Sequence, residues 1–232
     1  MNKPIIFLGS AVNLGRFIDA CYLNKTEIAG IIDKDYYGNT KEIQTIPVID
    51  SEQVFETEKI NYYKKNYEFF IVTTWLPGED TVTARNREKR QHLIDIVNRF
   101  DLPMANIIHP SAEIPPTVKF GRGVFVGALT FLQNRVSLGD FTQIREQCHI
   151  CHDTKILEDV IVQPMVYIGS NITVNNHSFI GIKSCLYGSN LIVGNNCLVH
   201  PNITVMRNLE DDEIAMVTGK VTKRIYESKN II

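Results

Sequence analysis

The chain has 232 residues, of which 44% are hydrophobic, and a formal net charge of -2 at pH 7. This length allows two modest cores or one large one, and the lysines and arginines are scattered among acids, so we do not expect nucleic acid as a partner. No apolar stretch approaches a membrane span and no signal peptide is recognisable, so a cytoplasmic protein that is not membrane-embedded is expected, with its five cysteines as free thiols.

The N-terminal part of the chain alternates short apolar strands with helical patterns. Strands are predicted at residues 5–8, 28–32 and 67–74, a helix follows the first of them, and another helix is predicted over 86–100. This order predicts a small open α/β sheet. We interpret residues 1–110 as a Rossmann-like domain that binds a sugar nucleotide.

A glycine loop follows the first strand and provides candidate substrate-binding residues. Backbone N–H groups near Gly9, Ser10 and Asn13, together with the N-terminus of the next helix, could hold a diphosphate. Asp33 ends the second strand, where nucleotide-binding units place a carboxylate that accepts hydrogen bonds from a ribose or base. Arg16 is a candidate phosphate partner, although an ordinary surface arginine fits the position equally well. A tight turn also needs glycine without any ligand, so the loop alone is a weak indication.

From residue 114 onward the aliphatic residues recur every sixth position. Such a repeat is typical of a parallel β-helix, in which six residues form one flat side, three sides form a triangular coil, and the aliphatic side chains stack into a central column. One extra residue falls within 188–191, after which the spacing resumes. Small or β-branched residues two positions before the aliphatics fit tight corners, and glycines directly after several aliphatics fit turns that a Cβ would hinder. The aliphatic positions are Ile114, Phe120, Val126, Leu132, Leu138, Ile144, Ile150, Ile156, Val162, Ile168, Val174, Ile180, Leu186, Val193, Val199 and Val205.

With these features the chain resembles the family of sialic acid O-acetyltransferases and nucleotide-sugar N-acetyltransferases, over nearly its whole length. The resemblance implies a left-handed β-helix acyltransferase domain over residues 111–232. It also implies a homotrimer in which acetyl-CoA or another acyl-CoA lies between two β-helices and the sugar nucleotide binds to the N-terminal domain. We expect no metal. Its marks are the first strand with its glycine loop, Ile46-Pro47-Val48, Asn86 to Arg90, Ile108 to Ala112, and His152-Asp153 at a coil corner.

Three features depart from the family pattern. The glycine loop is longer than usual, Ile161 replaces a second histidine found in some members, and Gly219 to Lys223 replaces a Gly-x-Pro-Ala-Lys segment. These departures leave open a donor other than acetyl-CoA, or a chain that binds ligands without turnover.

The candidate catalytic residues are His152 and Asp153. His152 lies two residues past the column residue Ile150, near a corner, where a neutral imidazole could take the proton of an attacking sugar amine or hydroxyl. Asp153 could fix the imidazole tautomer and stabilise its charged form. The alternative is a surface histidine beside a solvated acid.

The same segment spells C-x-x-C-H over residues 148–152, which is also the attachment motif of c-type haem. We reject that interpretation because Ile150 belongs to the column and no export signal is present. Zinc between subunits, held by His149, His152 and His177, is the other alternative.

We therefore expect an acyl-CoA-dependent N-acyltransferase that acts on a nucleotide-linked amino sugar in surface glycan synthesis. The sequence leaves three alternatives open: O-acylation of a sugar such as sialic acid, a zinc-dependent hydratase on the same fold, and a non-catalytic trimer that binds sugar nucleotides.

Overall fold

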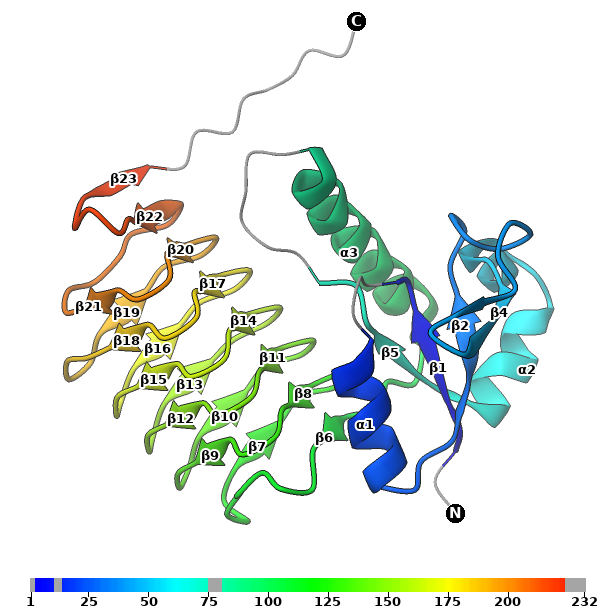
Figure 1. The fold of residues 1–232 in the computed structure, drawn as a ribbon, viewed down its shortest axis with the longest axis horizontal. Helices are drawn as coiled ribbons and strands as arrows, with labels where there is room; N and C mark the ends of the chain where they lie inside the picture. Colours follow the sequence, from blue (N-terminus) through cyan, green and yellow to red (C-terminus); the bar gives the residue numbers. More distant parts are fainter. Residues whose placement is uncertain (1–2, 11–13, 75–80, 224–232) are drawn as a thin grey trace, which may run out of the picture. The chain divides into compact units, whose positions relative to one another are not determined.

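The computed structural model describes residues 3–10, 14–74 and 81–223, and for residues 81–85 it describes the backbone only (Figure 1). The chain divides into two compact units. The first consists of residues 1–111 and 121–128, and the second of residues 112–120 and 129–232.

The first unit is built on an open sheet with the strand order β3-β4-β2-β1-β5. β1, β2, β4 and β5 are parallel, and β3 pairs antiparallel with β4. Its elements are β1 (Ile5–Leu8), α1 (Gly15–Leu23), β2 (Ile28–Ile32), β3 (Glu42–Ile43), β4 (Ile46–Asp50), the 3₁₀ helix η1 (Glu52–Glu56), α2 (Lys59–Asn66), β5 (Glu68–Ile71), α3 (Thr81–Phe100), β6 (Ile107–Ile108) and β8 (Phe125–Val126).

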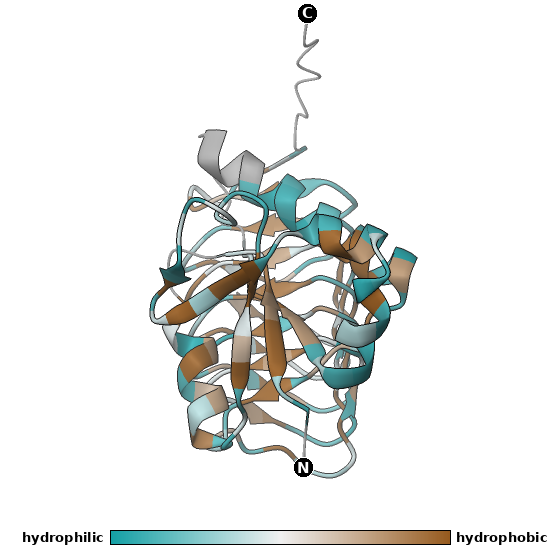
Figure 2. Cartoon of the chain, turned by 90° about the vertical axis from the view of Figure 1, so that its right-hand side faces the viewer, coloured by the Kyte–Doolittle hydropathy of each residue, from teal (hydrophilic) through white to brown (hydrophobic). Residues whose placement is uncertain are grey.

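An aromatic cluster forms much of the interior of this unit. Phe7, Phe17, Phe70 and Phe125 are at most 1% exposed, and the Phe17 and Phe125 ring centroids lie 4.8 Å apart in an edge-to-face arrangement. In Figure 2 the strands of the sheet are largely hydrophobic, whereas the helices beside them also carry hydrophilic residues. The strands predicted at 5–8 and 28–32 are confirmed, β5 is shorter than predicted, and α3 begins earlier than residue 86.

The second unit is a three-sided parallel β-helix whose short strands stack coil upon coil (Figure 1). It agrees with the left-handed β-helix expected from the hexapeptide repeat. One side has the order β19-β16-β13-β10-β7, the second β21-β18-β15-β12-β9, and the third contains β22-β20-β17-β14-β11. The strands are β7 (Lys119–Phe120), β9 (Phe131–Leu132), β10 (Ser137–Leu138), β11 (Gln143–Ile144), β12 (His149–Ile150), β13 (Lys155–Ile156), β14 (Ile161–Val162), β15 (Tyr167–Ile168), β16 (Thr173–Val174), β17 (Phe179–Ile180), β18 (Cys185–Leu186), β19 (Ile192–Val193), β20 (Leu198–Val199), β21 (Thr204–Val205), β22 (Glu213–Ala215) and β23 (Val221–Lys223).

The predicted aliphatic column is confirmed from Leu132 to Val205, where every member is at most 4% exposed. Residues of successive coils pair directly, as His149 does with Tyr167 and Ser137 with Lys155. Up to the extra residue near position 188, one coil therefore contains 18 residues, and each side chain lies beside the residue 18 positions further along the sequence.

The corners are built differently from the sequence prediction. The residues two positions before the aliphatics do not form the corners. From Val124 to Val160 they are buried. Where the residue is threonine, its hydroxyl donates to a backbone carbonyl, as Thr130 does to Arg145 (2.8 Å) and Thr154 to Gly169 (2.7 Å). The corner is the preceding residue, which adopts a left-handed conformation; φ is +61° at Arg135 and +60° at Asp153. At these two corners the polar side chains project to the outside, with Arg135 62% and Asp153 31% exposed. Phe141, a corner residue with a similar φ, is buried.

Close packing between coils, rather than a left-handed φ, explains several of the glycines. Gly139, Gly181 and Gly194 do not have positive φ, but a Cβ at each would lie 2.6 Å from a backbone atom of the next coil. Only glycine allows the coils to approach this closely.

Candidate functional site

His152 and Asp153 form a hydrogen-bonded pair at a corner of the β-helix. Asp153 Oδ2 lies 2.7 Å from His152 Nδ1, and the two side chains are 31% and 46% exposed. An ionised carboxylate only accepts hydrogen bonds, so Nδ1 carries the proton in this network and Nε2 is left as the basic nitrogen. The predicted catalytic residues thus lie together, half exposed, with the tautomer that a general base requires.

Arg135 completes this corner from the preceding coil. Its Nε donates to Asp153 Oδ1 (2.6 Å) and its Nη2 donates to Asp153 Oδ2 (2.8 Å), a bidentate ion pair. The guanidinium of Arg135 first, and then the hydrogen bond from His152, hold the pKa of the Asp153 carboxyl well below its usual range. Asp153 is therefore ionised throughout the mildly acidic and neutral range.

Gln133 links His152 to a second histidine. Its Oε1 accepts a hydrogen bond from the His152 backbone N–H (3.0 Å), and its Nε2 lies 3.1 Å from His149 Nε2. His149 in turn packs edge-on against Phe131 and beside Tyr167. His149 is thus part of the surroundings of His152.

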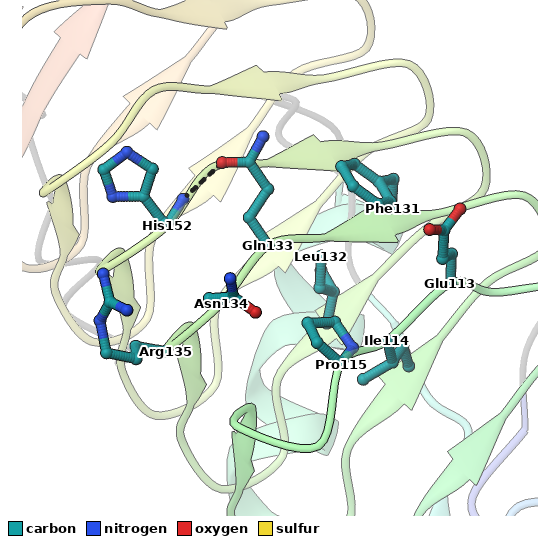
Figure 3. Close-up of a pocket in the computed structure, with 9 residues that line it drawn as sticks. All are labelled: Glu113, Ile114, Pro115, Phe131, Leu132, Gln133, Asn134, Arg135 and His152. Atoms are coloured by element: carbon teal, nitrogen blue, oxygen red, sulfur yellow. Dashed lines mark hydrogen bonds between the residues drawn. The ribbon is translucent and has the colours of Figure 1, made fainter.

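A hollow of about 640 Å³ opens beside His152. Figure 3 shows His152, Gln133 and Arg135 at one end and Glu113 and Phe131 at the other. The volume is that of a small-molecule site, and the lining combines an aromatic ring with amide, carboxylate and guanidinium groups. The arrangement can hold a polar molecule next to a basic nitrogen.

In the first unit, Asp33 is bound by the protein itself. The carboxylate is fully buried, and both of its oxygens accept from Lys89 Nζ, at 2.9 and 2.8 Å, while Oδ1 also accepts from the Asp35 backbone N–H. Lys89 bonds Asp35 as well, at 2.7 Å. Nearby, burial and the charge of Asp33 raise the pKa of Glu52. Asp33 lies at the strand end expected for a ligand-binding carboxylate, but Lys89 and the Asp35 backbone N–H together take up most of its hydrogen-bonding capacity.

The glycine loop has the backbone expected of a tight turn, but some of its polar groups are already bonded by other residues of the protein. Gly9 has φ +75°, and a Cβ there would collide with the Thr73 hydroxyl, which donates to the Ser10 carbonyl (3.1 Å). The Leu14 N–H at the start of α1 is bonded by the Gln44 side chain (3.1 Å). The predicted Asn13 lies outside the described residues.

Two further residues that the sequence analysis singled out, Ile161 and Cys148, are buried inside the β-helix. Ile161 is fully buried in β14 and offers no polar group in place of the second histidine of the family. The Cys148 thiol donates to the Gln163 carbonyl (3.1 Å), and burial raises the pKa of Cys148 to about 12, so this sulfur of the C-x-x-C-H motif is a core group.

Within residues 3–10, 14–74 and 81–223, no group of three or more His, Cys, Asp or Glu side chains could hold a metal ion. No helix in the same ranges is long and apolar enough to cross a membrane.

Sequence reasoning missed Arg135 and Gln133. The coil length brings both positions near the pair, since Arg135 lies 18 residues before Asp153 and Gln133 lies 19 before His152, but it does not specify which side chains meet. The same spacing produces a second histidine–aspartate contact, between His177 Nδ1 and Asp159 Oδ2 (3.2 Å), at a different corner.

Comparison with solved structures shows the fold of sugar N-acetyltransferases. A histidine-to-alanine variant of GDP-perosamine N-acetyltransferase from Caulobacter crescentus, in complex with CoA and GDP-perosamine, is 19% identical with a TM-score of 0.78, and the match covers 94% of this chain and 96% of that one. The acetyltransferase domain of PglB from Neisseria gonorrhoeae, in complex with acetyl coenzyme A, is 15% identical with a TM-score of 0.76, covering 92% and 96%. The expected resemblance is thereby confirmed for the fold.

Sequence comparison adds one curated relative. UDP-3-O-acylglucosamine N-acyltransferase from Polynucleobacter asymbioticus is 23% identical over 144 residues, which are 55% of this chain and 41% of the relative. The chain thus matches about two fifths of that protein's length. No protein-family model matches the chain.

Proposed function

We propose that the chain is an acyl-CoA-dependent N-acyltransferase that transfers an acetyl or related group to the amine of a nucleotide-linked sugar. The observation that carries this proposal is the His152–Asp153 pair beside the 640 Å³ hollow. The fold shared with N-acetyltransferases whose structures contain CoA, acetyl-CoA or GDP-perosamine supports the choice of donor and acceptor class.

In the proposed reaction, the sugar amine attacks the thioester carbon, a C–N bond forms, and the C–S bond of the acyl-CoA breaks. His152 Nε2 takes the proton lost by the amine and returns it to the departing thiolate. Asp153 keeps the Nδ1 proton in place and stabilises the imidazolium between these two transfers. A positioned general base contributes about a hundred- to ten-thousand-fold to the rate.

The nucleotide is assigned to the first unit, at the carboxyl ends of its parallel strands. Gly9, Ser10 and Asp33 lie in loops that leave β1 and β2 at this edge, which supports a Rossmann-like binding role for the unit. Because Lys89 bridges Asp33 and Asp35, we assign recognition to this charged group rather than to Asp33 alone.

The test is a matrix of acetyl-CoA and longer acyl-CoA donors against nucleotide-linked amino sugars, with mass spectrometry of the acylated product. Mass detection is preferred to thiol titration because the chain has five cysteines of its own. An acceptor with a hydroxyl in place of the amine distinguishes N- from O-transfer. Binding of both ligands without any product would contradict catalysis and leave a chain that only binds them.

A further inference from the structure

Arg135 is placed to control the charge of the catalytic corner. Three hydrogen bonds meet on the Asp153 carboxylate: two from the guanidinium of Arg135, and one from the imidazole of His152, which shares Oδ2 with Arg135 Nη2. A fork of two parallel N–H groups fixes both oxygens of a carboxylate in one plane. A contact between sequence neighbours such as His152 and Asp153 would otherwise leave that carboxylate free to rotate.

The polar and charged groups around His152 come from four successive coils. The preceding coil supplies Arg135, and the coil before that supplies Glu113 at the far end of the hollow. The coil of His152 itself supplies Asp153, and also His149, which is connected through Gln133. The next coil supplies the Tyr167 hydroxyl, which is bonded by the Cys151 thiol (3.3 Å). Among the described contacts, Arg135 is the cation that touches Asp153.

We propose that Arg135 is a positioning residue that orients Asp153 and compensates its charge, so that His152 is held in the correct tautomer without being driven into its protonated form. An uncompensated carboxylate next to an imidazole favours the imidazolium, which cannot act as a base. The bidentate arginine lets Asp153 act as an orienting acceptor while the corner stays close to neutral. This inference rests on the proposed function only for its catalytic consequence, because the electrostatic effect can be measured without turnover.

The direct test is an NMR titration of the His152 ring in protein whose histidines are isotopically labelled at a ring carbon. The His152 signal is identified as the one that disappears in His152→Asn. Arg135→Gln should move the pH midpoint of the His152 ring upward by about half a unit to one unit, since a positive charge a few ångströms away has been removed. Asp153→Asn should move it downward. In the Asp153→Asn background, the Arg135→Gln shift should be smaller, because without the carboxylate the guanidinium is no longer held at this distance from His152. Arg135→Lys keeps the charge without the fork, so its midpoint should stay near that of the parent.

Arg207→Gln is the matched control, because Arg207 is an exposed arginine with a carboxylate partner, Glu213, on a late coil. It should leave the His152 midpoint unchanged. An Arg135→Gln midpoint equal to that of Arg207→Gln, in protein that melts like the parent, would overturn the proposal.

The kinetic consequence separates this inference from the proposed function. In Arg135→Gln, the acid limb of the kcat/KM profile should move to higher pH by the amount seen in the NMR titration, while the high-pH plateau falls by less than about tenfold. Asp153 cannot produce this limb, because Arg135 holds the pKa of its carboxyl far below it in the parent. Loss of the plateau without a shifted limb or midpoint would assign Arg135 a structural role and overturn the inference. A shifted midpoint in a chain that forms no product would support the inference and contradict the proposed function.

Discussion

The left-handed backbone of Asp153 turns its carboxylate back toward the ring of the preceding residue. A corner residue with this φ has its side chain outside the packed column, so His152 and Asp153 can be replaced without opening a cavity in the interior. The Gln133 amide and the Arg135 guanidinium then fix the pair from the neighbouring coil. The chemistry of the site therefore depends on side chains that carry little of the folding energy.

We predict that His152→Ala folds normally and binds both ligands but transfers acyl groups at least about a hundredfold more slowly, because the positioned base is lost. His152→Asn should be equally slow, since an amide cannot take up the proton. The matched control is His177→Ala, which removes the histidine of the other His–Asp contact. His149 is not a suitable control because Gln133 connects it to His152. Equal rates for His152→Ala and the parent, measured by product mass, would contradict the assignment.

At the scale of elements, the exact register between coils determines which side chains meet. The aliphatic column could be predicted position by position, because a six-residue repeat leaves one arrangement that buries every member. Helix α2 could not be predicted in the same way, since its described side chains include no buried residue and therefore no apolar periodicity. The His152–Asp153 pair followed from the repeat and the family resemblance. Arg135 did not, because ion pairs between coils depend on side-chain direction at a corner, which the hydrophobic pattern does not specify.

The glycines between coils provide a test of this register. Gly181→Ala places a Cβ 2.6 Å from backbone atoms of the next coil, so it should lower the free energy of unfolding by about 1–3 kcal/mol. Gly169→Ala is the matched control: its Cβ would meet the Leu186 carbonyl at 3.3 Å, which a small shift relieves, and its cost should stay below about 1 kcal/mol. Chemical denaturation measures both, and equal losses would show that close approach is not what requires glycine at position 181.

The buried ion pair between Asp33, directly after β2, and Lys89 of α3 gives a prediction for the first unit. Asp33→Ala removes the fully buried partner of Lys89, which keeps only the half-exposed Asp35, so it should destabilise this unit by about 2–4 kcal/mol. Asp35→Ala should cost less than about 1 kcal/mol, because the contact it loses is exposed. In calorimetry, Asp33→Ala should weaken sugar-nucleotide binding and leave acyl-CoA binding unchanged. Undiminished nucleotide binding in folded Asp33→Ala would place the nucleotide elsewhere.

At the scale of the whole molecule, one face of the β-helix carries three exposed large apolar side chains. Tyr167, Tyr187 and Met206, which lie in or directly after β15, β18 and β21 of one sheet, are 37%, 57% and 70% exposed. Exposed apolar side chains that gather on one face are typical of interaction sites. They favour the homotrimer expected from the family resemblance, in which this face would contact another copy.

We predict that light scattering gives a mass of about three times 26.4 kDa. Tyr187→Glu should shift the chain toward monomer, since it places a charge among the exposed apolar side chains. Tyr22→Glu is the matched control, because Tyr22 is an 80% exposed tyrosine on α1 of the first unit. A monomeric parent with full activity would contradict an acyl-CoA site shared between copies.

The extra residue between β18 and β19 has a consequence for how such a chain can change over generations. It is absorbed in the turn at Gly188, where φ is +147°, and the column continues undisturbed at Val193. Coils beyond that turn can therefore gain or lose a residue without altering the corner that holds His152. Between Arg135 and Asp153 the situation is the reverse, because one inserted residue would carry Asp153 off its corner and separate the pair. Insertions and deletions in related chains should therefore be found after residue 188. They should be absent from the coil between Arg135 and Asp153.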